Sequence, residues 1–98
     1  MYSLNLLGLC RRAGKLSAGH DAVKISLRKK NAKLVIIAAD ASDRLRDEIE
    51  RLADGVPVLS VSETIDELSL LTGRKAAVMT VDDENFANGI TKDKQQED

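Results

Sequence analysis

Aromatic side chains are nearly absent from this sequence, which has one tyrosine, one phenylalanine and no tryptophan among 98 residues. Protein surfaces that bind single-stranded nucleic acid by base stacking, such as RNA-recognition motifs and OB-folds, need aromatic side chains on basic strands. Neither Tyr2 nor Phe86 lies in a basic strand pattern. The sequence therefore excludes recognition by stacking, and contact with a nucleic acid would have to use lysine, arginine and backbone groups.

Residues that bind metals are equally scarce. Cys10 and His20 are the only residues of their types, and no Cys-x-x-Cys or His-x-x-x-His spacing occurs. A zinc site needs a cluster of such ligands, so we expect no metal site. A single cysteine cannot form an internal disulfide either, which is typical of a reducing compartment and predicts a cytoplasmic location.

Patterns that indicate catalysis are also missing. Cys10 falls within an apolar helical pattern, where a small residue more often packs in the core than acts as a nucleophile. His20 and Asp21 could form a base and its orienting carboxylate, but adjacent residues rarely face each other, and both residues suit a helix start. The glycine-rich signatures of nucleotide cofactors do not occur. We predict no enzymatic activity, no cofactor and no small-molecule substrate; an enzyme that uses His20 or Asp21 is the third-ranked alternative.

The sequence also lacks long apolar runs. No run approaches the roughly 20 residues that a membrane-spanning helix needs. The apolar start of the chain has no basic residue before it and is interrupted by Asn5, unlike a signal peptide. We therefore expect a soluble, uncleaved chain with no membrane partner.

Charge is abundant and unevenly distributed. Residues 1–39 hold eight basic residues and one acidic residue, a net charge of +7, whereas residues 40–98 hold seven basic and fifteen acidic residues, a net charge of −8. Such asymmetry indicates an anionic partner on one face of the protein. A charge run is more often simply a solvated face, so this count alone does not predict RNA binding.

Helical and strand patterns alternate along the chain. Apolar spacing of three and four residues predicts helices over 3–13, 20–30, 43–53, 62–72 and 83–88, and apolar runs predict strands over 15–18, 33–39, 56–61 and 76–81. Ser3 and Ser62 are the expected N-caps of the first and fourth helices. Arg11 and Arg12 suit the C-terminus of the first helix. The expected buried sides are Leu6, Leu9, Cys10 and Ala13 in the first helix and Leu45, Ile49 and Leu52 in the third. The run over 33–39 is continuously apolar, as in a strand that is covered on both faces. The alternation predicts an α/β fold, a three-layer α/β/α sandwich around a mixed, roughly four-stranded sheet. We expect one domain over residues 1–90 and a polar, disordered tail over 91–98.

The stretch from Gly14 to Lys24 is the best candidate for a binding site. We interpret it as a helix stop, a short strand and then Gly19, which opens a second helix. A helix N-terminus presents unpaired backbone N–H groups and the positive end of the helix dipole, which suits a phosphate. Lys15, Lys24 and Arg28 are expected to surround that position. The same local pattern is also the ordinary way of joining a strand to a helix.

Several segments together resemble a known family. They are Gly14-Lys15-Leu16, Gly19-His20-Asp21-Ala22, the run from Ala32 to Ala41, Val56-Pro57-Val58, Glu67-Leu68 and Thr72-Gly73. In this order and spacing, over roughly residues 4–90, the chain resembles the kink-turn-binding ribosomal protein family in its small bacterial YlxQ-like branch. The resemblance implies an α/β/α sandwich that binds structured RNA without catalysis, typically at kink-turns with tandem sheared G·A pairs. It also implies ribosomal or other ribonucleoprotein components as partners.

The resemblance assigns the RNA face to three places: the start of the second helix, the loop after the central strand and the loop after the fourth helix. Together with Arg28 from the charge argument, the predicted RNA-binding residues are Lys15, Gly19, His20, Asp21, Lys24, Arg28, Asp40, Ala41, Gly73, Arg74 and Lys75.

Three positions depart from the family pattern. Where known binders carry Asn-Glu and, three residues later, a lysine, this chain has Asp21, Ala22 and Ile25. The glutamate that would accept a hydrogen bond from a guanine edge is therefore absent. The resemblance then implies binding of the RNA backbone and phosphates on this face. The alternative function is a protein-interaction module that uses the acidic second half of the chain, with RNA contact incidental.

Overall fold

The computed structural model describes residues 4–96, with side chains up to residue 91. Helices and strands alternate as predicted. The elements are α1 (Leu6–Arg12), β1 (Leu16–Ala18), α2 (His20–Arg28), β2 (Leu34–Ile37), α3 (Asp43–Ala53), β3 (Val58–Ser60), α4 (Ile65–Thr72), β4 (Val78–Val81) and α5 (Glu84–Gln96). None of these helices is long and apolar enough to cross a membrane.

The four strands form one mixed sheet in the order β1-β4-β2-β3. β4 runs antiparallel to both of its neighbours, β1 and β2, whereas β2 and β3 are parallel. β1, β2 and β3 therefore all run in the same direction. This arrangement confirms the predicted mixed, four-stranded sheet.

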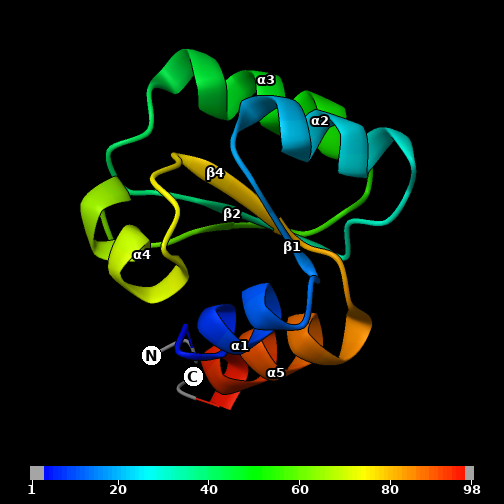
Figure 1. Cartoon of the computed structure of the whole chain (residues 1–98). Helices are drawn as coiled ribbons and strands as arrows, with labels where there is room; N and C mark the ends of the chain where they lie inside the picture. The colour runs from blue at the N-terminus through cyan, green and yellow to red at the C-terminus, as the bar shows by residue number, and fades with distance from the viewer. Residues whose placement is uncertain (1–3, 97–98) are drawn as a thin grey trace.

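The helices cover both faces of the sheet (Figure 1). α2 and α3 pack on one face, where Val23 and Ile49 contact a cluster that includes Val35 and Ile37 of β2. α1, α4 and α5 pack on the other face, around the alternate β2 residues Leu34 and Ile36. Because successive strand residues point to opposite faces, a strand buried on both sides must be apolar throughout. The continuous apolar run over 33–39 accordingly forms an internal strand, and the three-layer sandwich is confirmed.

α1 buries a face that differs in part from the one its spacing predicted. The predicted inner face was Leu6, Leu9, Cys10 and Ala13. Cys10 is fully buried as predicted, but so is Leu7, and 49% of Leu9 is exposed. A Cβ on Gly8 would lie 3.0 Å from the carbonyl oxygen of Leu71 in the segment of α4 that faces it. The glycine permits this close helix contact, and the contact turns the Leu7–Cys10 side toward the sheet.

The cap of α4 was also predicted wrongly. Thr64, not Ser62, is the N-cap, and its hydroxyl accepts a hydrogen bond from the Glu67 N–H at 3.2 Å. The Glu67 carboxylate accepts in return from the Thr64 N–H at 3.0 Å. This reciprocal capping box satisfies two otherwise unpaired donors, so it outcompetes a single serine cap. Ser3, the expected cap of α1, lies outside the described residues.

α5 extends to Gln96, whereas a helix over 83–88 and a disordered tail from Thr91 were predicted. Ala87 and Ile90 are buried and hold the helix against the sheet. Each further residue then adds a backbone hydrogen bond at small entropic cost, and lysine and glutamine are good helix formers. Residues 97 and 98 lie outside the described part of the chain.

A polar cluster joins α2 to the sheet around Asp82. Its carboxylate accepts hydrogen bonds from Ser17 of β1 at 2.5 Å, Ser26 of α2 at 2.6 Å and Thr80 of β4 at 2.8 Å. Ser26 and Thr80 are buried. One carboxylate therefore satisfies hydroxyl donors from three elements, and the spacing of these residues in the sequence gave no sign of it.

Candidate nucleic-acid interface

Three helix N-termini lie at one end of the sheet. β1, β2 and β3 run in the same direction, and each is followed by a helix, α2, α3 or α4, that begins at the end where the strand stops. We call this the loop end, made of residues 18–24, 38–42, 61–65 and 73–77. Helix N-termini carry partial positive charge, so three of them together favour an anion there. The opposite end is the far end, made of residues 12–15, 28–33, 54–57 and 82–83.

Backbone hydrogen bonds join the three predicted places at the loop end. The N–H of Gly19 donates to the carbonyl of Val78 at 2.9 Å, and the N–H of Ala38 donates to the carbonyl of Ala77 at 2.9 Å. The segment just after Lys75 is thus held between the start of α2 and the loop after β2. The structure therefore brings together the three places that the resemblance implied, and Figure 1 shows the loops before α3 and before β4 on the same side of the molecule.

Only the N-terminus of α2 lacks a side-chain cap among these three helices. Ser42 caps α3 by accepting from the Leu45 N–H at 3.1 Å, and Thr64 caps α4. Gly19, the N-cap of α2, has no side chain to accept a hydrogen bond. Its φ of 102° and ψ of 159° lie in a region that is essentially restricted to glycine. The first-turn amides of α2 remain available to an anionic ligand.

The Glu48 carboxylate on α3 contacts two polar side chains in the first turns of α2, His20 and Lys24. The Glu48 carboxylate lies 2.8 Å from Nε2 of His20 and 3.9 Å from Nζ of Lys24. The hydrogen bond from His20 is the main cause that lowers the pKa of Glu48, and the charges of His20, Lys24 and Arg51 add to it. Glu48 was absent from the predicted site because only the packing of α3 beside α2 places it there.

The exposed face of α2 carries the positions that depart from the family pattern. Ile25 is 47% exposed, and Ala22 lies one turn before it on the same helix. The Asp21 side chain is almost fully exposed, and its carboxylate lies 3.7 Å from Nδ1 of His20. The surface next to the free amides is thus mainly apolar and acidic.

The loop after β2 has a structural role. The Asp40 carboxylate accepts a hydrogen bond from the N–H of Ile65 at 2.8 Å, which ties this loop to the start of α4. The N–H of Ala39 donates to the carbonyl of Glu63 at 2.8 Å. Ala41 is half-buried and packs against the core cluster under α2 and α3. These residues shape the loop end, and Asp40 already uses one oxygen within the protein.

The loop after α4 supplies the exposed cations. Gly73 ends α4 with a φ of 72°, and the Thr72 hydroxyl fixes the turn by accepting from the Arg74 N–H at 3.1 Å. Arg74 and Lys75 are exposed, and Nζ of Lys75 lies 3.1 Å from the carboxylate of Asp66. The guanidinium of Arg11 lies beside this loop, 3.3 Å from where a Cβ on Gly73 would be. Arg11 was given only a helix-terminus role from the sequence, because its proximity depends on how α1 packs against α4.

Lys15 and Arg28 are not at the loop end, which corrects the expectation that they surround the start of α2. Lys15 precedes β1, and its carbonyl accepts from the Asp82 N–H at the far end. Four residues of extended chain separate it from Gly19, or about 13 Å. Arg28 is the last residue of α2, about 12 Å along the axis from His20. The spacing in sequence could not reveal this, because a strand and a helix carry their two ends apart.

Two features of the described residues concern the metal and nucleophile candidates of the sequence. No group of three or more His, Cys, Asp or Glu side chains there could hold a metal ion. Cys10 is fully buried, and its Sγ donates to the carbonyl of Lys15 at 2.9 Å. Burial, followed by the charges of Asp82 and Asp83, raises the pKa of the Cys10 thiol to about 11. A thiol with this pKa is a poor nucleophile near neutral pH.

Comparison with known proteins identifies relatives of the chain. The family model of the ribosomal protein L7Ae/L30e/S12e/Gadd45 family matches residues 3–90. The chain is 30% identical over 87 residues to the RNA-binding protein YlxQ of Enterococcus faecium. The alignment covers 87% of this chain and 84% of that protein. It is 36% identical over 88 residues to the RNA-binding protein YlxQ of Bacillus subtilis (strain 168), covering 87% of each.

Solved structures show the same fold. A Bacillus halodurans protein of unknown function matches with a TM-score of 0.84 and 26% identity, over 91% of this chain and 92% of that one. A 15.5 kDa RNA-binding protein of Giardia lamblia matches with a TM-score of 0.72 and 21% identity, over 91% and 78% of the two chains. At that identity the second match supports the fold alone.

Proposed function

Because the chain belongs to the ribosomal protein L7Ae/L30e/S12e/Gadd45 family, we propose that it binds structured RNA at the loop end and carries out no catalysis. The target is a kink-turn-like or ribosomal RNA, and ribosomal or other ribonucleoprotein components are its partners. A cytoplasmic location of the protein is supported by Cys10, which is a free and buried thiol.

The observation that carries this proposal is the uncapped N-terminus of α2 beside the exposed cations of the α4–β4 loop. Backbone amides at a helix N-terminus bind phosphate oxygens in a fixed geometry. Arg74 and Lys75 supply exposed positive charge in the α4–β4 loop, where Lys75 is paired with Asp66, and Arg11 adds a third cation beside Gly73. Phosphate contacts of this kind position a protein on RNA.

Paired alanine substitutions test the location of the interface. Arg74→Ala should lower the affinity for ribosomal RNA fragments several-fold. It should also reduce the slope of log affinity against log salt concentration by about one, which corresponds to the loss of one phosphate contact. Lys15→Ala removes an equal charge at the far end and should change the affinity less. Filter binding or fluorescence anisotropy between about 50 and 200 mM salt measures both effects. Equal losses for the two variants, or affinity that does not depend on salt, would contradict an interface at the loop end.

A second measurement addresses kink-turn specificity. The wild type should discriminate weakly between a kink-turn with tandem sheared G·A pairs and the same RNA with Watson–Crick pairs in their place. Ala22→Glu with Ile25→Lys restores the two family side chains on the exposed face of α2 and should increase this discrimination to about tenfold or more, since a base-edge contact contributes ~1–3 kcal/mol. Strong discrimination by the wild type would show that other side chains read the bases.

A further inference from the structure

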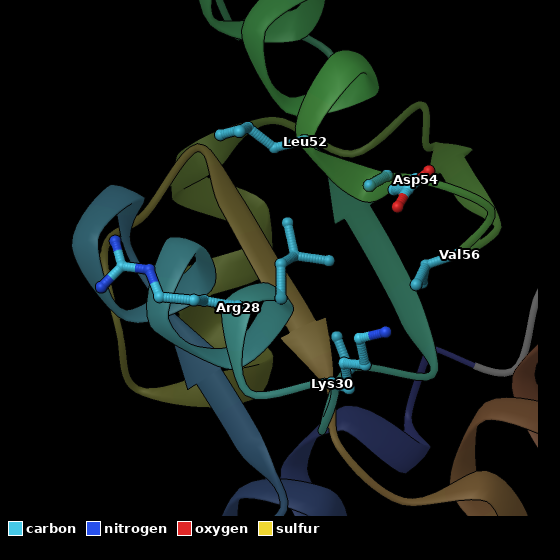
Figure 2. Close-up of a pocket in the computed structure, with 8 residues that line it drawn as sticks. Arg28, Lys30, Leu52, Asp54 and Val56 are labelled. Atoms are coloured by element: carbon cyan, nitrogen blue, oxygen red, sulfur yellow. The ribbon is translucent and has the colours of Figure 1, made fainter.

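The far end holds a groove between the C-terminal ends of α2 and α3. Its volume is about 400 Å³, and Figure 2 shows Arg28, Lys30, Leu52, Asp54 and Val56 around it. A smaller hollow of about 220 Å³, lined by Lys24, Arg28, Leu52 and Leu27, adjoins it along the two helices. Both hollows share Arg28 and Leu52, so they form one continuous surface feature.

The floor of the groove is apolar. Leu52 was predicted to lie on the buried side of α3, yet 41% of it is exposed. Leu27 and Val56 are half-buried and pack against the core cluster beneath. Leu52, together with the half-buried Leu27 and Val56, forms an apolar surface on which an apolar side chain of a partner can pack.

The rim of the groove is mainly cationic. Arg28 and Lys30 are exposed on the α2 side, with Asp54 on the α3 side. Lys24 is engaged by Glu48, but no carboxylate is within 4 Å of the Arg28 or Lys30 cation among the side chains that the structure describes. The two cations are therefore available to an external anion.

We infer that this groove binds an acidic amphipathic segment of a partner protein, with one apolar side chain on Leu27, Leu52 and Val56 and flanking carboxylates on Arg28 and Lys30. An apolar centre with a charged rim is the usual anatomy of a protein interface, and helical segments commonly dock apolar faces into such grooves. A nucleic acid fits less well, because the aliphatic floor offers no hydrogen bond to a base edge or a phosphate. The larger hollow, which takes the apolar side chain, lies at the C-terminal end of α2, whereas the proposed RNA interface lies at the N-terminal end, so the two partners can bind at once.

A displayed library of random 16-residue peptides, selected on the immobilised full-length chain at physiological salt, tests the inference. Selected peptides should carry net negative charge together with leucine, isoleucine or phenylalanine. The synthetic form of the most enriched peptide should shift the methyl resonances of Leu27, Leu52 and Val56 in ¹H–¹³C spectra. Leu52→Gln and Arg28→Glu should each weaken its binding by about tenfold, as expected for central interface residues.

Lys33→Glu is the matched control, because Lys33 is an exposed cation at the same end that does not line the groove. Its peptide affinity should stay within about twofold of the wild type, and thermal unfolding checks that all variants fold. Leu52→Gln should leave RNA affinity unchanged, which separates failure here from failure of the proposed function.

Three results would overturn the inference. One is the absence of enriched peptides, or enrichment without acidic residues. Another is self-association of the wild type that Leu52→Gln removes, which would make a second copy of the chain the occupant. The third is a shift of the same three methyl groups by structured RNA with no response to peptide.

Discussion

The two ends of α2 carry positive charge of different kinds. At its N-terminal end the charge belongs to backbone amides in the first turn, and the neighbouring side chains His20 and Lys24 are held by Glu48. At the far end the charge belongs to the exposed side chains of Arg28 and Lys30, beside an apolar groove. Amides fixed in a helix favour a ligand with defined geometry, whereas flexible cations attract anions of many shapes. The comparison shows that a net charge of +7 over residues 1–39 says little about where an anion would bind.

The largest expected effect concerns stability at the far end. Asp82→Ala should lower the free energy of unfolding by about 3 kcal/mol, because it leaves the buried hydroxyls of Ser26 and Thr80 without their acceptor. Chemical denaturation measures the loss. Asp83→Ala is the matched control, since Asp83 only caps the start of α5 and its loss should cost about 1 kcal/mol. A loss for Asp82→Ala no greater than for Asp83→Ala would mean that the cluster contributes little.

The next effect is a loss of RNA affinity that we expect from a substitution at the loop end and not from one at the far end. Gly19→Val forces a branched side chain to a φ of 102° and should cost about 1–3 kcal/mol of stability through backbone strain. It should also weaken RNA binding about tenfold by displacing the first-turn amides of α2, a loss comparable to one good anion contact. Titration of labelled RNA, under conditions where the variant is folded, measures the second effect.

Gly55→Val is the control for Gly19→Val. Gly55 has a φ of 93° at the far end, and a Cβ at either glycine would meet no atom within 4 Å. Both variants should therefore lose stability through strain, but only Gly19→Val should lose RNA affinity. An equal loss of RNA affinity in both would remove the distinction between the ends.

A smaller effect, of opposite sign, comes from releasing His20 and Lys24 at the loop end from their contact with Glu48. Glu48→Gln removes the anion beside His20 and Lys24 and should raise RNA affinity by about two- to threefold, as expected for a single surface charge. Glu50→Gln removes the same charge from the exposed side of α3 and should change affinity less. If Glu48 instead orients His20 toward RNA, its removal will weaken binding.

The smallest effect is a dependence of stability on pH. Because the folded protein lowers the pKa of Glu48 below its usual 4.5, chiefly through the hydrogen bond from His20, the stabilisation is fully present above about pH 4.5. It is lost as the pH falls through the lowered pKa, since protonation ends the interaction. Unfolding curves of the wild type and Glu48→Gln should therefore converge as the pH is lowered below 4.5. A difference in stability between the two proteins that does not change with pH would show that the His20–Glu48 pair adds nothing to stability.

Local sequence patterns predicted the elements well and the packing less well. The apolar run over 33–39 became an internal strand, and Gly19 opens α2, because both depend on short-range chemistry. The predicted buried face of α1 was right for Cys10 and wrong for Leu9, because the contact of Gly8 with the α4 segment decides which side faces the sheet. For the candidate site, the three loops were correctly expected to meet, whereas Lys15 and Arg28 lie at the other end of β1 and α2.

Residue type and local spacing suffice to derive the alternation of strands and helices, the glycine at the start of α2 and the scarcity of stacking or metal-binding side chains. They do not show which charges are neighbours, because that depends on how the elements pack. The tertiary structure placed Glu48 on His20 and Lys24, gathered three hydroxyls on Asp82 and left Leu52 uncovered beside Arg28. Those pairings join residues from different elements, and their distances depend on how helices pack across a sheet, which no local pattern encodes.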